Sequence, residues 1–278
     1  MRNMKRINKI IAILIVGGGG LVMMLPFIFL VSSSFKAANK IYVFPPQLIP
    51  DPFRWQNYVE VFQNVPVLVY AKNTLIITVF ATIGTVFSSI LAGYAFGRLH
   101  FKGRDTVFAL LLATLMLPYV VTMIPIYVMF SKMGWVNTLL PLIVPSFFGE
   151  AFYIFLLRQF FRTIPMELED AARIDGAGRP RILFQIMVPL ARPAITVVTI
   201  LTVLDNWNAF MQPLIFLTKR SVWTLALGLN SLQRFETGRD WTHYMMVLGV
   251  FMVGPVVLLY FLAQREFIEG IVMTGMKT

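Results

Sequence analysis

Six long apolar stretches, separated by more polar segments, dominate the pattern along the chain. They cover residues 10–31, 74–96, 106–130, 139–160, 194–217 and 244–262. Each has about the length, roughly 20 residues, that a helix needs to cross the hydrocarbon core of a bilayer. The pattern predicts an all-α fold, that of a polytopic membrane protein with six transmembrane helices between residues 10 and 262.

The first stretch follows a basic N-terminus and is similar in layout to a secretory signal peptide. Its apolar run, residues 10–31, is as long as a full bilayer crossing, and no clear cleavage site follows in Ser32, Ser33 and Ser34. The apolar core of a signal peptide is shorter, about 7–15 residues. We therefore interpret this stretch as a retained first span.

Lys and Arg predict the orientation of the spans, because cytoplasmic loops are enriched in basic residues. Most of the 24 Lys and Arg residues lie inside when the N-terminus is placed in the cytoplasm. The short loop 97–105 carries the clearest signal, with Arg98, Lys102 and Arg104. The predicted cytoplasmic ends are residues 1–9 and 263–278.

Two segments between the stretches are too polar to cross a bilayer. The first, residues 32–73, is an expected external loop that begins with several prolines and then turns amphipathic. Trp55, Tyr58 and Phe62 lie on its apolar face, which predicts an interfacial helix. The second segment, residues 161–193, is the expected cytoplasmic loop.

Composition supports the membrane interpretation. Hydrophobic residues make up 58% of the 278 residues and charged residues 13%, whereas soluble domains carry about 25% charged residues. The net charge of +11 is scattered between apolar runs, which argues against a nucleic-acid surface. There is no cysteine, so disulfides, thiolate catalysis and cysteine-bound metals are excluded.

The segment 161–193 predicts a short capped helix. Thr163 is a suitable N-cap, and Pro165 fits a first helical turn. Arg173 follows Glu169 by four residues and lies on the same helix face. Gly176 can adopt the left-handed conformation that ends a helix. A second short helix is expected up to about residue 189. Two interpretations stay open: docking to a soluble partner, or an amphipathic loop lying on the bilayer.

Short sequence elements follow one another in a fixed order within this segment. They are Asp170-Ala171-Ala172, Asp175-Gly176-Ala177, Ile186-Met187-Val188-Pro189 and Pro193. Their order resembles the EAA loop of the permeases of ABC transporters that import solutes. Asp170 departs from the family pattern, which usually has Glu there, so its side chain reaches one methylene less far.

The resemblance extends over nearly the whole chain. Further similar elements are Phe44-Pro45-Pro46, Ala92-Gly93-Tyr94-Ala95, Phe101-Lys102-Gly103, Trp207-Asn208 and Gln264-Arg265-Glu266-Phe267. They are typical of the carbohydrate-uptake branch, and the layout is similar to the shorter permease of the maltose-type heterodimer. The resemblance implies the permease fold of type I ABC importers in a bacterial plasma (inner) membrane.

The family resemblance also implies partners and a mechanism. In that family the EAA loop is a coupling helix lodged in a cleft of an ATPase subunit, and ATP-driven closure produces alternating access. The implied partners are a second, homologous permease forming a heterodimer, two ATPase subunits, an external solute-binding protein and a sugar substrate. ATP and Mg would be bound by the ATPases and no cofactor by this chain. The implied coupling residues are Glu169, Asp170, Ala171, Ala172, Arg173, Asp175 and Gly176.

Two carboxylates lie inside expected spans, Glu150 in the fourth and Asp205 in the fifth. An ionisable group there costs about 2.5–3.5 kcal/mol on insertion scales and usually faces the bundle interior or a cavity. The candidate solute path comprises Tyr119, Glu150, Tyr153, Asp205, Asn206, Trp207 and Asn208. Hydrogen bonding between helices is the alternative role for these groups, and the family pattern favours it for Trp207 and Asn208.

Several other chemistries are not supported by the sequence. The glycines at 17–20 lie in an apolar span without a following Gly-Lys-Ser/Thr, so they are not a phosphate loop. We find neither a nucleotide-binding motif nor a catalytic constellation, and His100 and His243 fall on opposite sides of the expected membrane, so no metal site is predicted. Three alternatives stay open: a permease for another solute such as glycerol phosphate, an ion-coupled secondary transporter using Glu150 and Asp205, and an intramembrane enzyme.

Overall fold

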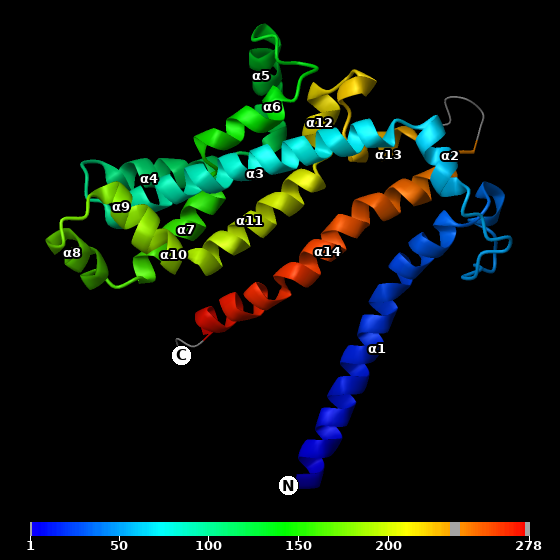
Figure 1. The fold of residues 1–278 in the computed structure, drawn as a ribbon, viewed down its shortest axis with the longest axis horizontal. Coiled ribbons are helices and arrows are strands. Elements are labelled where there is room, and N and C mark those ends of the chain that lie inside the picture. Colours follow the sequence, from blue (N-terminus) through cyan, green and yellow to red (C-terminus); the bar gives the residue numbers. More distant parts are fainter. Residues whose placement is uncertain (1, 234–239, 276–278) are drawn as a thin grey trace. The chain divides into compact units, whose positions relative to one another are not determined.

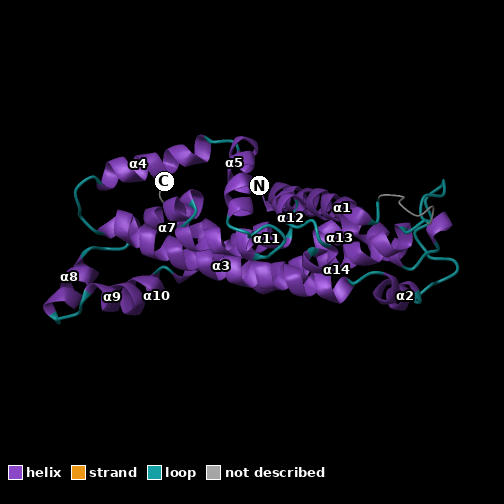
Figure 2. Ribbon diagram, turned by 90° about the horizontal axis from the view of Figure 1, so that it is seen from above, coloured by secondary structure: helices purple, strands orange, loops and turns teal. Residues whose placement is uncertain are grey.

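The computed structural model describes residues 2–233 and 240–275, with side chains for residues 11–233 and 240–264. All regular structure in these residues is helical (Figure 2). The chain divides into two compact units, Met1–Val67 with Gly228–Gly254, and Leu68–Leu227 with Pro255–Thr278. The predicted cytoplasmic ends are residues 1–9 and 263–278. Apart from residues 263 and 264, their side chains lie outside the described residues.

Four described segments are long and apolar enough to cross a membrane as single spans. They are Ile11–Ser34 in α1 (Arg2–Ser34), Val67–Arg98 (α3), Leu140–Thr163, and Thr242–Gln264 in α14 (Thr242–Gly275). Two further segments qualify if each bent helix pair counts as one span. These are Arg104–Met116 with Tyr119–Lys132, and Arg179–Leu190 with Arg192–Trp207. The described chain therefore has four to six candidate spans. They overlap the predicted stretches, but the last bent pair begins inside the segment 161–193, which was predicted to be a cytoplasmic loop.

The third predicted span is not continuous. Helix α4 (Arg104–Ala113) runs into a 3-10 turn, and α5 (Tyr119–Lys132) leaves it at an angle of 100°. The break falls at Leu117 and Pro118, which are both extended. Pro118 has no N–H to donate and disfavours helical geometry at the residue before it. The predicted stretch 106–130 is therefore divided between two helices.

The fourth and fifth predicted spans are also interrupted. Helix α6 (Leu140–Ile143) passes into a 3-10 turn that ends at Gly149, whose φ is +93°, before α7 (Ala151–Thr163) begins. In the fifth stretch, α11 (Arg192–Trp207) ends well before residue 217, and a separate α12 (Met211–Phe216) follows.

Helices α3 and α7 pack closely in the second unit (Figure 1). A Cβ on Gly93 would lie 3.0 Å from Cβ of Leu157, and one on Gly97 would lie 3.3 Å from the carbonyl oxygen of Arg158. Two glycines four residues apart let helix backbones approach, as is common in membrane helices. The core around this contact includes Tyr94, Leu157, Phe161, Ile182, Met187 and Val198.

The segment 161–193 forms two short helical pieces at one end of α3 (Figure 1). Helix α8 spans Glu167–Ile174, and α9 (Arg179–Ile182) continues through a π-helical turn into α10 (Val188–Leu190). Gly176 has φ +79°, as the sequence predicts. Thr163 is not the N-cap of α8: it ends α7, and its hydroxyl donates to the carbonyl of Phe160. Met166 precedes α8 instead.

The first unit contains α1, α2 (Asn57–Asn64) and the first part of α14. Helix α2 falls where the amphipathic pattern predicts a helix, and its Asn57 donates to the carbonyls of Ser34 and Lys36. The apolar window of α1 has none of its residues buried within the described chain. Helix α13 (Leu225–Ser231) crosses the boundary between the units.

Candidate functional site

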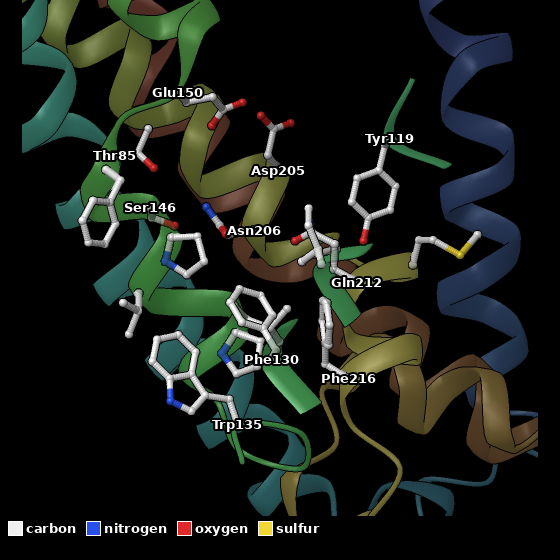
Figure 3. A pocket seen from close by; sticks show the side chains of 18 of the residues that line it. Thr85, Tyr119, Phe130, Trp135, Ser146, Glu150, Asp205, Asn206, Gln212 and Phe216 are labelled. Atoms are coloured by element: carbon white, nitrogen blue, oxygen red, sulfur yellow. The ribbon is translucent and has the colours of Figure 1, made fainter. Parts of the chain in front are cut away.

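A cavity of about 920 Å³ lies within the second unit (Figure 3). Its walls come from α3, from α5 with the loop after it, from the broken segment between α6 and α7, and from the junction of α11 with α12. The labelled lining residues are Thr85, Tyr119, Phe130, Trp135, Ser146, Glu150, Asp205, Asn206, Gln212 and Phe216. The breaks that interrupt the predicted spans therefore build this cavity.

Two carboxylates give the cavity its charge. Glu150 sits at the N-cap position of α7 in extended conformation, and Asp205 lies in the last turn of α11. The lining residues, all of them within the described part of the chain, include no Lys, Arg or His. Asn206 and Gln212 add amide donors and acceptors. The cavity is therefore suited to a polar solute that lacks negative charge.

Aromatic rings line another part of the cavity. The ring of Phe130 stacks on that of Trp135 at 5.3 Å between centroids and meets Phe216 edge-on at 5.5 Å. Phe130 and Phe216 are buried, whereas Trp135 is partly exposed, so the indole of Trp135 offers the apolar ring face on which a ring-shaped solute can stack. The arrangement can bind a molecule through hydroxyl groups and ring faces together.

Tyr153 takes part in the site indirectly. Its hydroxyl donates to Oδ2 of Asp205 over 2.5 Å and so joins α7 to α11, but Tyr153 does not line the cavity. Trp207 and Asn208 do not line it either, and the Asn208 amide donates to the carbonyl of Leu204. Of the seven residues in the predicted solute path, the structure brings four to the cavity: Tyr119, Glu150, Asp205 and Asn206.

Several lining residues are missing from the predicted path. Gln212 could have been found, since it is a polar residue within the apolar run 194–217. Thr85 and Ser146 carry no such signal, because hydroxyl side chains are ordinary in membrane helices, where they bond to the backbone. Trp135 follows the third predicted span, and its ring joins the cavity wall by stacking on Phe130 near the end of α5.

A second candidate site is helix α8, whose residues divide between two faces. Glu169 is fully buried, and Ala172 is 7% exposed. Asp170, Ala171, Asp175 and Gly176 are exposed, and so are the apolar side chains of Leu168 and Ile174. Exposed apolar residues beside carboxylates suit the docking of another protein surface. The predicted coupling residues thus do not all share one surface.

The fold and the cavity indicate the class of protein: apolar helices that are broken beside a polar cavity are typical of membrane transport proteins. The chain belongs to the family described as "Binding-protein-dependent transport system inner membrane component", whose signature matches residues 84–271. A permease component of this kind is not itself a catalyst. The family and the fold that the sequence predicts are thereby confirmed.

Individual relatives are similar over almost the full chain. The inner membrane ABC transporter permease protein YcjP of Escherichia coli K12 is 32% identical over 260 residues, which cover 92% of both chains. The arabinooligosaccharides transport system permease protein AraQ of Bacillus subtilis is 32% identical over 263 residues, again covering 92% of both. The diacetylchitobiose uptake system permease protein NgcG of Streptomyces coelicolor is 31% identical, covering 91% of this chain and 84% of its own length.

A solved structure shares the fold. A chain of a bacterial ABC transporter involved in the import of the acidic polysaccharide alginate superposes with a TM-score of 0.83, covering 94% of this chain and 97% of that one. The two sequences are 22% identical, so this likeness concerns the fold alone.

Proposed function

We propose that the chain is one permease subunit of an ATP-driven, binding-protein-dependent importer that carries a neutral sugar or oligosaccharide through the bacterial plasma membrane. The cavity carries this proposal, because it combines carboxylates, amides and stacked aromatic rings in one space. Relatives named for arabinooligosaccharide, diacetylchitobiose and lactose transport point to the same class of cargo.

The charge of the cavity favours a neutral cargo over glycerol phosphate. A relative at 30% identity is named as an sn-glycerol-3-phosphate permease, so this cargo is a specific alternative. A phosphate group is bound most strongly by Arg or Lys. The described lining offers Glu150 and Asp205 instead, and these would repel a phosphate.

Alternating access needs helices that can change their angles around the cargo. The breaks at Pro118, Gly149 and Asn208 border the cavity and leave short helical pieces on either side. Interrupted helices beside a midplane cavity are typical of transporters. Movement at these breaks would open the cavity to one side of the membrane and then to the other.

Helix α8 is the proposed contact with the ATPase. Its exposed face presents Leu168, Asp170 and Ile174, while Gly176 ends the helix with a sharp turn. The complete assembly would hold a second permease, two ATPase subunits that bind ATP and Mg, and an external solute-binding protein. Both termini and the segment 161–193 would then lie in the cytoplasm, as the Lys and Arg distribution predicts.

The test is uptake into proteoliposomes that contain the complex, purified from its native membrane through a tag on this chain. Radiolabelled arabinotriose, diacetylchitobiose and lactose serve as the neutral-sugar panel, and glycerol 3-phosphate as the anionic competitor. We expect ATP-dependent uptake of a panel sugar that excess glycerol 3-phosphate does not reduce. Uptake of glycerol 3-phosphate and of none of the sugars would show that the proposed cargo is wrong and that the cargo is glycerol 3-phosphate.

Two variants test the contact with the ATPase. Gly176→Asp places a side chain where φ is positive, and Asp170→Lys reverses a charge on the exposed face. We expect both to abolish stimulated ATP hydrolysis and uptake. Arg104→Gln, which removes an ion pair with the exposed Asp105 outside the segment 161–193, should leave both unchanged. Uptake that persists without ATP, or without ATPase subunits, would instead support an ion-coupled transporter.

A further inference from the structure

Arg98 and Glu169 form an ion pair that is almost entirely buried. Arg98 is the last residue of α3, and its Nε lies 2.6 Å from Oε1 of Glu169 in α8. The exposed fractions of the two side chains are 5% and 0%. The same guanidinium donates through Nη2 to the carbonyl of Pro165, just before α8, over 3.1 Å. One planar group therefore holds α8 at two points.

The second oxygen of Glu169 leads to the exposed face of α8. Oε2 lies 3.2 Å from Nη2 of Arg173, and Nη1 of Arg173 lies 3.0 Å from Oδ1 of Asp170. Both Arg173 and Asp170 are about half exposed. A continuous network of charged hydrogen bonds thus runs from the outer face of α8 to the end of α3.

Helix α3 continues from this network to the cavity. It has 32 residues, none of them proline, so its backbone ladder is uninterrupted. Thr85 lines the cavity and precedes Arg98 by 13 residues, a distance of about 20 Å along the helix. The hydroxyl of Ser88 lies 3.2 Å from the carbonyl oxygen of Ser146, another lining residue, and 2.8 Å from that of Gly84 in its own helix. The two candidate sites are therefore joined by one rigid helix.

A buried ion pair contributes little net stability, because desolvation of the two charges offsets their attraction. Helix α8 is already attached by apolar packing through Ala172 and the neighbouring Ile164. The short connections on either side of α8, residues 164–166 and 175–178, would absorb a displacement of α8 if packing were its only attachment. The pair supplies what packing does not, a directional link to α3.

We infer that Arg98 is a positioning residue that transmits movement of α8 to α3, and through α3 to the cavity. This inference rests on the proposed function, since the ATPase would supply the movement. Loss of the pair leaves α8 free to follow the ATPase without moving α3. ATP is then hydrolysed without transport, which a purely stabilising role would not produce.

The experiment measures sugar molecules imported per ATP hydrolysed, in proteoliposomes holding the complete complex, with the panel sugar that the wild type imports fastest. The variants are Arg98→Gln, Glu169→Gln and the milder Arg98→Lys, which retains the charge but cannot reach both acceptors. Arg104→Gln, which removes the ion pair with the exposed Asp105 outside the segment 161–193, is the matched control. Copurification of the ATPase subunits reports assembly. We expect the Gln variants to assemble and to import about 5-fold fewer sugar molecules per ATP, or fewer still. Arg98→Lys should give a ratio between those of the Gln variants and the wild type.

Three results would overturn the inference. The first is an unchanged number of sugar molecules imported per ATP in assembled variants. The second is a parallel fall of uptake and ATP hydrolysis, which would show that the pair only stabilises the protein. If the Gln variants fail to assemble, an assembled Arg98→Lys complex with the wild-type ratio would also overturn it. Absence of ATP-dependent uptake in the wild type would refute the proposed function itself. The wild-type measurement therefore separates failure of the proposed function from failure of the inference about Arg98.

Discussion

The side-chain oxygen of Asn137 accepts three hydrogen bonds from the chain 81 and 82 residues further on. Its donors are the backbone N–H and the hydroxyl of Thr218, at 2.7 and 2.8 Å, and the backbone N–H of Lys219, at 2.8 Å. Asn137 itself has φ +64°, a conformation that Asn tolerates better than most residues. One side chain thus joins the loop after α5 to the end of α12, next to the cavity.

Replacement of Asn137 should loosen this connection. Asn137→Ala leaves three donors without their acceptor, and we expect the free energy of unfolding to fall by about 1–2 kcal/mol, because the site is exposed and water replaces part of the loss. Asn137→Asp keeps an acceptor oxygen and serves as the control. Thermal unfolding of the purified chain in detergent measures both, and equal midpoints for the two variants would contradict the assigned role.

The close approach of α3 and α7 predicts a steric effect at Gly93. In Gly93→Val the new side chain meets Cβ of Leu157 and the backbone nitrogen of Arg158, which lie 3.0 and 3.2 Å from the position of a Cβ. Overpacking of this kind costs about 1–3 kcal/mol. Gly254→Val is the control, since nothing lies within 4 Å of its Cβ position. Similar unfolding midpoints for the two variants would show that α3 and α7 separate more easily than their packing indicates.

The hydrogen bond from Tyr153 to Asp205 predicts an effect on cargo affinity. Tyr153→Phe keeps the ring in the core and removes only the donor that orients the carboxylate. A hydrogen bond to a charged group contributes about 1.5–3 kcal/mol, so we expect the KM for uptake of the panel sugar to rise by about 10-fold or more. Assembly should not change. The control is Tyr260→Phe on the exposed surface of α14. An unchanged KM in Tyr153→Phe would show that Tyr153 does not contribute to cargo binding.

Asp240 predicts a dependence of stability on pH. Hydrogen bonds from the side chain and then the backbone of Thr242 at the start of α14 lower the pKa of this carboxyl below its ordinary value of 3.8. Because the pKa of Asp240 is lower in the folded than in the unfolded chain, its carboxylate stabilises the folded state at pH values above the ordinary pKa. This stabilisation is lost as the pH falls through the pKa of the folded state. The exposed position keeps the contribution below about 1 kcal/mol.

Asp240→Asn removes the charge and keeps an acceptor for the N–H of Thr242, which lies 3.0 Å from Oδ1. We expect the wild type to unfold at a slightly higher temperature than this variant near neutral pH, with the difference disappearing below pH 4. Thermal unfolding of both proteins at a series of pH values measures this. A difference that stays constant over the series would show that the charge contributes nothing.

The sequence locates the spans well and their breaks poorly, for a physical reason. Length and hydropathy are local properties, so each predicted apolar stretch corresponds to helical structure. A proline alone does not show where a helix breaks: Pro26 and Pro255 lie inside α1 and α14, whereas Pro118 separates α4 from α5. Whether neighbouring groups hold a helix together around its proline depends on tertiary structure.

The candidate path illustrates the same limit at the level of side chains. Asp205, Asn206, Trp207 and Asn208 are consecutive, but successive residues of a helix point about 100° apart, so they cannot all face one cavity. The structure turns Asp205 and Asn206 toward it. Similarly, Glu169 and Asp170 are neighbours in the coupling motif, yet Glu169 faces α3 and Asp170 faces outward. The direction in which each of these side chains points depends on the fold, and the sequence alone does not determine it.

Helix α1 differs from the other apolar helices in having no residue of its apolar window buried within the described chain. Within the described chain these side chains are left for lipid or another polypeptide to cover. Each Leu, Ile, Val or Phe near the middle of such a helix favours insertion by about 0.3–0.6 kcal/mol. This contribution comes from the sequence of the helix itself and needs no contact with the other spans.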